Sequence, residues 1–164
     1  MDLLDISLIL SITLCSLVSG FISTYAIVVM PGLSNLSDRD FIRAFQVTDA
    51  VIQNNRPVFM FTWVGSIVSL ITTIVTSVIS FGLAETWLVV LLSVIYLLGV
   101  HGVTLAVHIP LNNHVQKVVI EHSSDVAIKH ERVKFERKWN VFNNIRTCIS
   151  VSVSLQLLVL LSLR

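Results

Sequence analysis

Residues 57–83 read PVFMFTWVGSIVSLITTIVTSVISFGL, without an acidic or basic side chain among them. A helix needs about 20 predominantly apolar residues to cross the hydrocarbon core of a bilayer, and this stretch is longer. In lipid, only helices and closed barrels satisfy all their backbone hydrogen bonds. A barrel strand would be shorter and would alternate apolar and polar residues, so the stretch predicts a transmembrane helix.

Three further stretches have the same character, and they cover approximately residues 6–30, 86–109 and 139–163. The chain is 54% hydrophobic and 13% charged, with a mean hydropathy of +0.85, whereas soluble domains carry about 25% charged residues. We therefore predict an all-α, integral membrane four-helix up-down bundle, forming a single transmembrane domain over residues 1–164. Its partner is the lipid bilayer. The acidic start of the chain differs from the basic start of a signal peptide, which favours a retained first helix.

Basic residues are distributed unevenly among the polar segments. Nine of the 11 Lys and Arg residues lie in two long connections, approximately residues 31–56 and 110–138. The N-terminal flank and the short connection near Glu85 contain none, and the C-terminus contains only Arg164. The positive-inside rule therefore predicts that both long connections are cytoplasmic and that both termini lie outside. In a bacterium this membrane would be the inner (plasma) membrane.

The first long connection has the pattern of an extra amphipathic helix. Pro31-Gly32 is expected to end the first transmembrane helix. Ser37 or Asp38 can cap a new helix. Apolar residues recur at helical spacing over residues 41–52, which predicts a helix that lies at the membrane interface or folds back on the bundle.

Amide side chains are concentrated near these two connections. Gln46, Asp49 and Gln53 share one face of the amphipathic helix, and this face is either solvated or directed into the end of the bundle. Asparagine is costly in hydrocarbon unless its amide finds partners. Their concentration at one end therefore predicts either a ligand site or a polar clamp between helices. The chain contains three asparagine pairs, Asn54-Asn55, Asn112-Asn113 and Asn143-Asn144.

The third hydrophobic stretch contains two histidines. His101, Thr104 and His108 fall on one helical face, and ionisable residues inside a membrane segment indicate function by default. Seven residues of helix separate the two imidazoles by about 10.5 Å, which is too far for direct ligation of one metal ion. Separate haem or ion sites and imidazoles hydrogen-bonded within the bundle are the two alternatives. We predict no metal site and no cofactor.

Arg146 lies inside the fourth hydrophobic stretch, on the same helical face as Asn143. An arginine at this depth either extends its charge outward to the interface or needs a carboxylate or an anionic ligand. We predict Asp49 as its partner.

Several segments together resemble one known family. They are Met30-Pro31-Gly32-Leu33, Phe45-Gln46 with Asp49, the asparagines before Pro57 and Phe59, Ile109-Pro110-Leu111-Asn112-Asn113, and Trp139 with Asn143-Asn144-Ile145-Arg146-Thr147. This order is similar to that of the anthrone oxygenase-like family of small four-helix integral membrane proteins, over nearly the whole chain. The chain departs from the family pattern at Asp49, where the pattern has asparagine.

The resemblance implies that the protein oxidises a membrane-soluble phenolic or anthrone-like substrate, because fungal members are implicated in converting anthrones to anthraquinones without a recognised cofactor motif. We expect such an oxygenase to work at the cytoplasmic end of the bundle, with Asp49 or His108 removing a proton. The alternative is a non-catalytic carrier or assembly protein whose polar cluster is structural. No feature indicates a nucleic-acid partner, and the oligomeric state is left open. The predicted substrate-binding residues are Gln46, Asn54, Asn112, Asn113, Asn143, Asn144 and Arg146.

Overall fold

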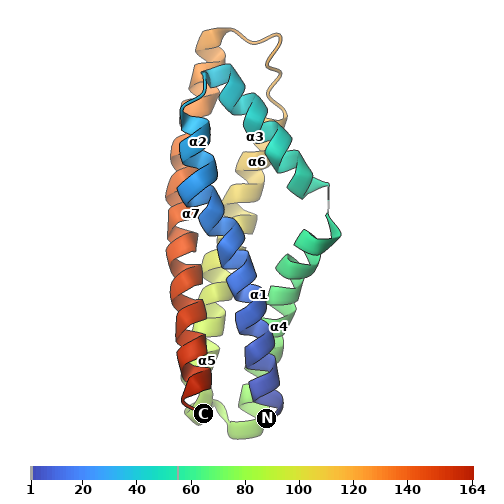
Figure 1. The fold of residues 1–164 in the computed structure, drawn as a ribbon, viewed down its shortest axis with the longest axis vertical. Coiled ribbons are helices and arrows are strands. Elements are labelled where there is room, and N and C mark those ends of the chain that lie inside the picture. The colour runs from blue at the N-terminus through green and yellow to red at the C-terminus, as the bar shows by residue number, and fades with distance from the viewer. Residues whose placement is uncertain (1, 55) are drawn as a thin grey trace.

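The computed structural model describes residues 2–54 and 56–164, and it contains helices and no strand within those ranges (Figure 1). Both termini lie at one end of the molecule, which we call the terminal end. The opposite end carries both long connections, and we call it the connection end. The helical segments are α1 (Leu3–Thr24), η1 (Tyr25–Val29), α2 (Met30–Ser34), α3 (Asp38–Gln53), α4 (Pro57–Phe81), α5 (Leu83–Tyr96), η2 (Leu97–Gly102), η3 (Thr104–His108), α6 (Ile109–Gln116) and α7 (Asp125–Ser162), where η denotes π-helix.

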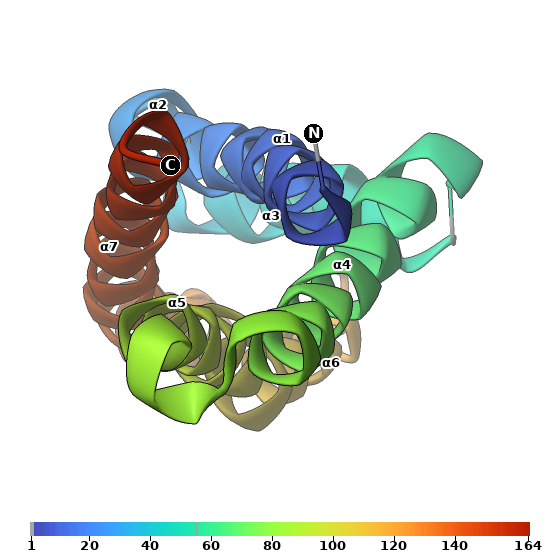
Figure 2. The same ribbon diagram turned by 90° about the horizontal axis from the view of Figure 1, so that it is seen from below.

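Four continuous helical rods are long and apolar enough to cross a membrane: Leu3–Ser34, Pro57–Phe81, Leu83–Gln116 and Asp125–Ser162. Seen along the bundle, α1, α4, α5 and α7 form a ring in which α1 lies beside α4 and α7 (Figure 2). The predicted integral membrane four-helix bundle is therefore confirmed.

The prediction that Pro31-Gly32 ends the first helix is wrong, because the helix continues to Ser34. The π-helical turn of η1 immediately precedes this proline. A proline lacks the N–H that a regular helix would use and its ring crowds the preceding turn. The wider π-helical turn gives this ring room. Pro110 follows η3 in the same way, so the two prolines in the interior of a rod lie just after a π-helical segment, whereas Pro57 begins α4.

The predicted amphipathic helix is confirmed as α3. The Oγ of Ser37 accepts a hydrogen bond from the backbone N–H of Asp40, so Ser37 is the N-cap. Its apolar face, which includes Phe41 and Phe45, is buried. Of the two predicted arrangements, α3 therefore folds back on the bundle, where it contacts α6 and α7.

The connection between α4 and α5 is a single residue, Gly82. Its φ of 77° lies in the left-handed region, where a side chain would be strained. Only glycine adopts this conformation easily, and it allows α4 and α5 to form a tight antiparallel hairpin.

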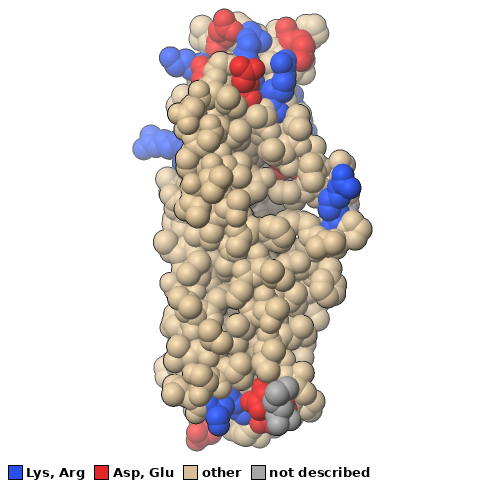
Figure 3. All heavy atoms as spheres, viewed as in Figure 1, with Lys and Arg blue, Asp and Glu red and all other residues tan. Residues whose placement is uncertain are grey.

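The buried apolar residues form two separate clusters. The larger lies among the four rods and includes Leu8, Tyr96 and Leu157. The smaller, at the connection end, includes Phe45 and Trp139. At 1.5 Å per residue the 38-residue α7 is about 57 Å long, nearly twice the ~30 Å hydrocarbon thickness. The smaller cluster therefore extends the bundle beyond the apolar belt, and Figure 3 shows charged residues mainly at the two ends.

Two arginines fasten the connection end. Arg132 donates to the backbone oxygens of Ser34 and Leu36 at 2.8 Å each, and its guanidinium also pairs with Asp38 and Glu136. It thereby satisfies carbonyls at the end of α2, where the helix supplies no donors. In the same way Arg39 donates to two backbone oxygens of the α6–α7 connection, Ile120 O and Ser123 O, and to the carboxylate of Asp125 at the start of α7. These contacts hold α3 above the end of the bundle.

Candidate functional site

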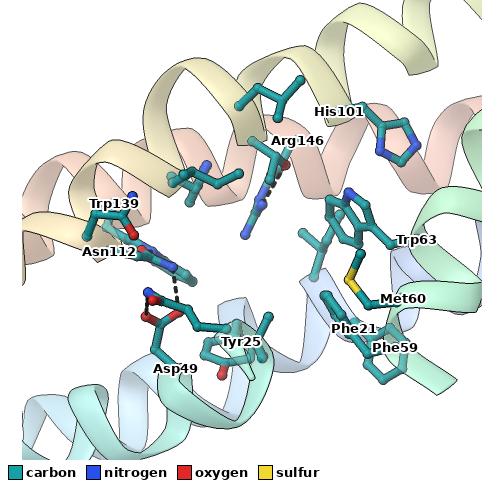
Figure 4. Close-up of a pocket in the computed structure, with 18 of the residues that line it drawn as sticks. Phe21, Tyr25, Asp49, Phe59, Met60, Trp63, His101, Asn112, Trp139 and Arg146 are labelled. Atoms are coloured by element: carbon teal, nitrogen blue, oxygen red, sulfur yellow. Dashed lines mark hydrogen bonds between the residues drawn. The ribbon is translucent and has the colours of Figure 1, made fainter. Parts of the chain in front are cut away.

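A cavity of about 510 Å³ lies between the two apolar clusters, beneath α3. Residues from every rod and from α3 line it (Figure 4). Its volume falls within the roughly 300–1,000 Å³ of small-molecule sites. It is the natural place in this fold for a ligand of moderate size.

The three π-helical segments place residues on the wall of this cavity. Tyr25 begins η1, His101 lies in η2, and Thr104 and His108 begin and end η3; all four line the cavity. A π-helical turn shifts the direction of the side chains that follow it, and such turns are frequent at functional sites. The face predicted for His101, Thr104 and His108 is therefore directed into the cavity.

One half of the cavity is aromatic. The rings of Phe59 and Trp63 are stacked, with centroids 5.5 Å apart and planes 20° apart, and Phe21 packs against Phe59 at 5.6 Å. Figure 4 shows these three residues, with Met60, on the side of the cavity away from α3. Such a wall suits a flat aromatic ligand. Neither Phe21 nor Trp63 is among the site residues predicted from the sequence.

The opposite side of the cavity carries polar groups among apolar ones, and we call it the polar half. It centres on Asp49, which is 2% exposed. Its Oδ1 accepts from Asn112 Nδ2 at 2.7 Å, and its Oδ2 accepts from Gln53 Nε2 at 2.6 Å and Gln116 Nε2 at 3.0 Å. The predicted ion pair with Arg146 is wrong. Three amide groups satisfy this carboxylate instead, so no cation is needed to solvate it.

Asn112 connects this carboxylate to Trp139. The Oδ1 of Asn112 accepts from the indole N–H of Trp139 at 3.0 Å. The ring of Trp139 in turn lies edge-on to His108, with centroids 5.1 Å apart, and 5.7 Å from the guanidinium carbon of Arg146. The chain Asp49–Asn112–Trp139 therefore fixes a surface against which His108 and Arg146 both pack.

Arg146 projects from α7 between the polar and aromatic halves (Figure 4). Its Nε donates to Asn143 Oδ1 at 2.9 Å, and its Nη1 donates to Thr104 Oγ1 at 2.9 Å. Asn143 itself donates to the backbone oxygen of Ile22 at 3.3 Å. The neutral acceptors Asn143 and Thr104 thus take the place of Asp49, the partner predicted from the sequence. The sequence did not indicate Thr104 as a partner of Arg146.

Both membrane histidines border the cavity and are buried. The Nε2 of His101 lies 3.2 Å from Ser66 Oγ, whereas its Nδ1 has no partner among the described residues. For His108, neither ring nitrogen has a partner in residues 2–54 and 56–164. The predicted bundle hydrogen bond is therefore present for His101 and absent for His108. Within the same ranges, no three His, Cys, Asp or Glu side chains form a metal-binding group.

The structure brings only part of the predicted site together. Asp49, His108, Asn112, Asn113 and Arg146 line the cavity, and Asn143 lies directly behind Arg146.

The remaining predicted residues lie elsewhere. Gln46 donates to the backbone oxygens of Val115 and Val118 and so ties α3 to the end of α6. Asn54 is exposed at the end of α3. Asn144 borders a smaller recess of about 310 Å³ between α2 and α7. Asn55 falls outside the described residues.

A comparison with known protein families shows which family this chain belongs to. Residues 57–155, more than half of the chain, match the family described as Anthrone oxygenase. The chain belongs to this family. The comparisons with curated proteins and with solved structures give no match. The part matched to the anthrone oxygenase family contains His108, Asn112 and Arg146, whereas Asp49 precedes it.

Proposed function

We propose that this protein is a membrane oxygenase that oxidises an anthrone-like, membrane-soluble phenol inside the cavity. His108 carries the proposal, because it is a buried histidine without a hydrogen-bond partner among the described residues, on the wall of a cavity that has aromatic rings on one side and polar groups on the other. The family description supports the same chemistry. Buried polar groups are normally hydrogen-bonded, so an orphaned imidazole is suited to a partner that arrives with the substrate.

The reaction converts an anthrone and O₂ into an anthraquinone and water. His108 removes a proton from the methylene carbon, and the electron pair of that C–H bond moves into the ring system to give an enolate. The electron-rich carbon then reacts with O₂, forming a C–O bond and, after protonation, a hydroperoxide. Loss of the second proton with cleavage of the O–O bond leaves the carbonyl and releases water.

We assign the catalytic base to His108 rather than to Asp49, although both line the cavity. The carboxylate of Asp49 already accepts three hydrogen bonds from amide groups, so both of its oxygens are engaged with the protein. Asp49 instead holds Asn112 and, through it, Trp139. Hydrogen bonds of a catalytic base often form only in the substrate complex, so His108 need not be engaged beforehand.

We assign substrate contacts to Asn112 and Asn113, which line the cavity from α6, and to the stacked rings of Phe59 and Trp63. Gln46, Asn54 and Asn144 have no place in the substrate contact, because none of them lines the cavity. In this arrangement the tricyclic rings occupy the aromatic half and the oxygens face the polar half.

The charge distribution supports an orientation with the connection end in the cytoplasm and both termini outside. The cavity then opens near the cytoplasmic face. A reporter fused after Arg164 that is active only outside the cytoplasm tests this orientation. Activity of a cytoplasmic reporter at the same position would reverse it.

The non-catalytic alternative has one observation in its favour. The network of Asp49, Asn112 and Trp139 joins α3, α6 and α7, as a structural clamp would. Incubating the purified protein with an anthrone under labelled O₂ separates the two functions. We expect product above the protein-free control, with one labelled oxygen atom in each new carbonyl group. Equal product with and without protein would refute the oxygenase.

A further inference from the structure

Arg146 is a charged side chain held at the centre of the bundle. It is 7% exposed and lies in a rod that is apolar enough to cross the membrane. A buried charge without a counter-charge loses several kcal/mol of hydration, and such groups are normally paired or bound to a ligand. The position of this guanidinium therefore calls for a negative partner.

The described residues do not supply that partner. None of their carboxylates lies within 4.0 Å of Arg146, and the nearest candidate by location, Asp49, is occupied by three amides. The two acceptors that Arg146 does contact, Asn143 and Thr104, are neutral. They orient the guanidinium but leave its charge uncompensated.

The free part of the guanidinium faces the cavity. Nε and Nη1 are held by Asn143 and Thr104, whereas Nη2 donates no hydrogen bond within the described residues. Trp139 packs beside the guanidinium group. Figure 4 shows Arg146 projecting into the space between Asn112 and Trp63. An arginine fixed at two nitrogens and open at the third is a pre-organised donor for one oxygen of a ligand.

We propose that Arg146 forms an anion subsite that binds the ionised oxygen, phenolate or enolate, of a flat hydroxyaromatic ligand whose rings lie against Phe59 and Trp63. This deepens the proposed function and rests on it for the substrate class. In the reaction, the guanidinium stabilises the oxygen on which the charge of the enolate develops when His108 takes the proton. Arg146 thus makes the methylene group more acidic within the cavity.

Binding of two non-reacting probes tests the subsite. A dihydroxyanthraquinone has ionisable hydroxyls, and unsubstituted anthraquinone has the same ring system without them. With protein in lipid nanodiscs, we expect the hydroxylated probe to bind with the red-shifted absorption of its ionised form. In Arg146→Met its affinity should fall at least about tenfold, which is what one charge-assisted hydrogen bond supplies. The affinity of Arg146→Met for unsubstituted anthraquinone should stay within about twofold of that of the natural protein, because this probe has no ionised oxygen to lose a charge-assisted hydrogen bond.

Two further variants keep the test decisive. Arg137→Met removes an exposed arginine of the same helix and should bind both probes as the natural protein does. Arg146→Lys retains the charge and should keep the spectral shift with weaker binding, even if Arg146→Met does not fold. Equal affinity of both probes for the natural protein without a spectral shift, or unchanged binding in Arg146→Met, would overturn the proposal.

This outcome is separate from that of the proposed function, because neither probe can be turned over. Binding with a spectral shift but without anthrone oxidation would leave the subsite and refute the oxygenase. Anthrone oxidation that persists in Arg146→Met would leave the oxygenase and refute the subsite.

Discussion

Asp49 and Arg146 line the same cavity, yet they do not form an ion pair. Each contacts neutral neighbours: amide donors surround the carboxylate, and an amide and a hydroxyl accept from two of the three guanidinium nitrogens. Two opposite charges that could neutralise each other are thus held apart by structure. This separation leaves the guanidinium available to a ligand while the carboxylate organises the wall.

Asp49→Ala should destabilise the protein. Removing the carboxylate takes the acceptor from Asn112 and Gln53 and one of two acceptors from Gln116, which still donates to the backbone oxygen of Gln46. A buried polar group left unsatisfied costs about 1–3 kcal/mol. In detergent, the thermal unfolding temperature of Asp49→Ala should be clearly lower than that of the natural protein, and that of Asp49→Asn should fall less. Glu121→Ala, which removes an exposed pair with Arg43, should change little. Matching unfolding temperatures for Asp49→Ala and Glu121→Ala would contradict this role.

Trp63→Ala should weaken binding of unsubstituted anthraquinone by roughly tenfold, because a stacked aromatic face is worth about 0.5–1.5 kcal/mol beyond its buried area. Trp87→Ala is the matched control, since Trp87 is 57% exposed and does not line the cavity. Titration of both variants with the probe in nanodiscs measures the difference. If Trp87→Ala lost as much affinity as Trp63→Ala, the aromatic half would not be the ring site.

Arg132→Ala should loosen the connection end. The variant loses bonds to two backbone oxygens and two carboxylates, from a side chain that is only 12% exposed. We expect about 2 kcal/mol of lost stability, in the range of hydrogen bonds to charged groups. Hydrogen exchange of α3 amides should rise in this variant. Arg43→Ala, which removes an exposed pair with Glu121 at 3.4 Å, should leave the hydrogen exchange of α3 unchanged. Faster α3 exchange in Arg43→Ala than in Arg132→Ala would contradict the role of Arg132 in holding the connection end together.

Gly82→Ala should destabilise the α4–α5 hairpin by about 1 kcal/mol, because alanine is strained at a φ of 77°. Gly20→Ala is a fitting comparison, since a Cβ there meets nothing within 4 Å and the position is helical. Alanine in a helix is favoured over glycine, so this second variant should be neutral or stabilised. Equal thermal stabilities of the two variants would show that the turn conformation is not strained for alanine.

The sequence was sufficient for the features that depend on local pattern. Long apolar stretches predicted the four rods, and the cap at Ser37 with the apolar spacing after it predicted α3. The π-helical turns escaped prediction, and this is why Pro31 was misread as the end of a helix.

For the predicted site residues on the rods, position along the sequence was enough to indicate which of them lie near one another. His108, Asn112 and Arg146 lie on the part of their rods that borders the cavity, and all three line it. The hydrogen-bond partners of these side chains could not be predicted from the sequence. Arg146 had several acceptors within reach, and the difference between Asp49 and Thr104 depends on side-chain placement across three elements.

The rate of anthrone oxidation in His108→Phe, compared with His101→Phe and the natural protein, tests the central claim most directly. General-base catalysis contributes typically 10²–10⁴-fold, so His108→Phe should lose at least about 100-fold while still binding the anthraquinone probe. His101→Phe, which removes a histidine hydrogen-bonded to Ser66, should lose much less. A His108→Phe variant that oxidises anthrone as fast as the natural protein would contradict the assignment of His108 as the base.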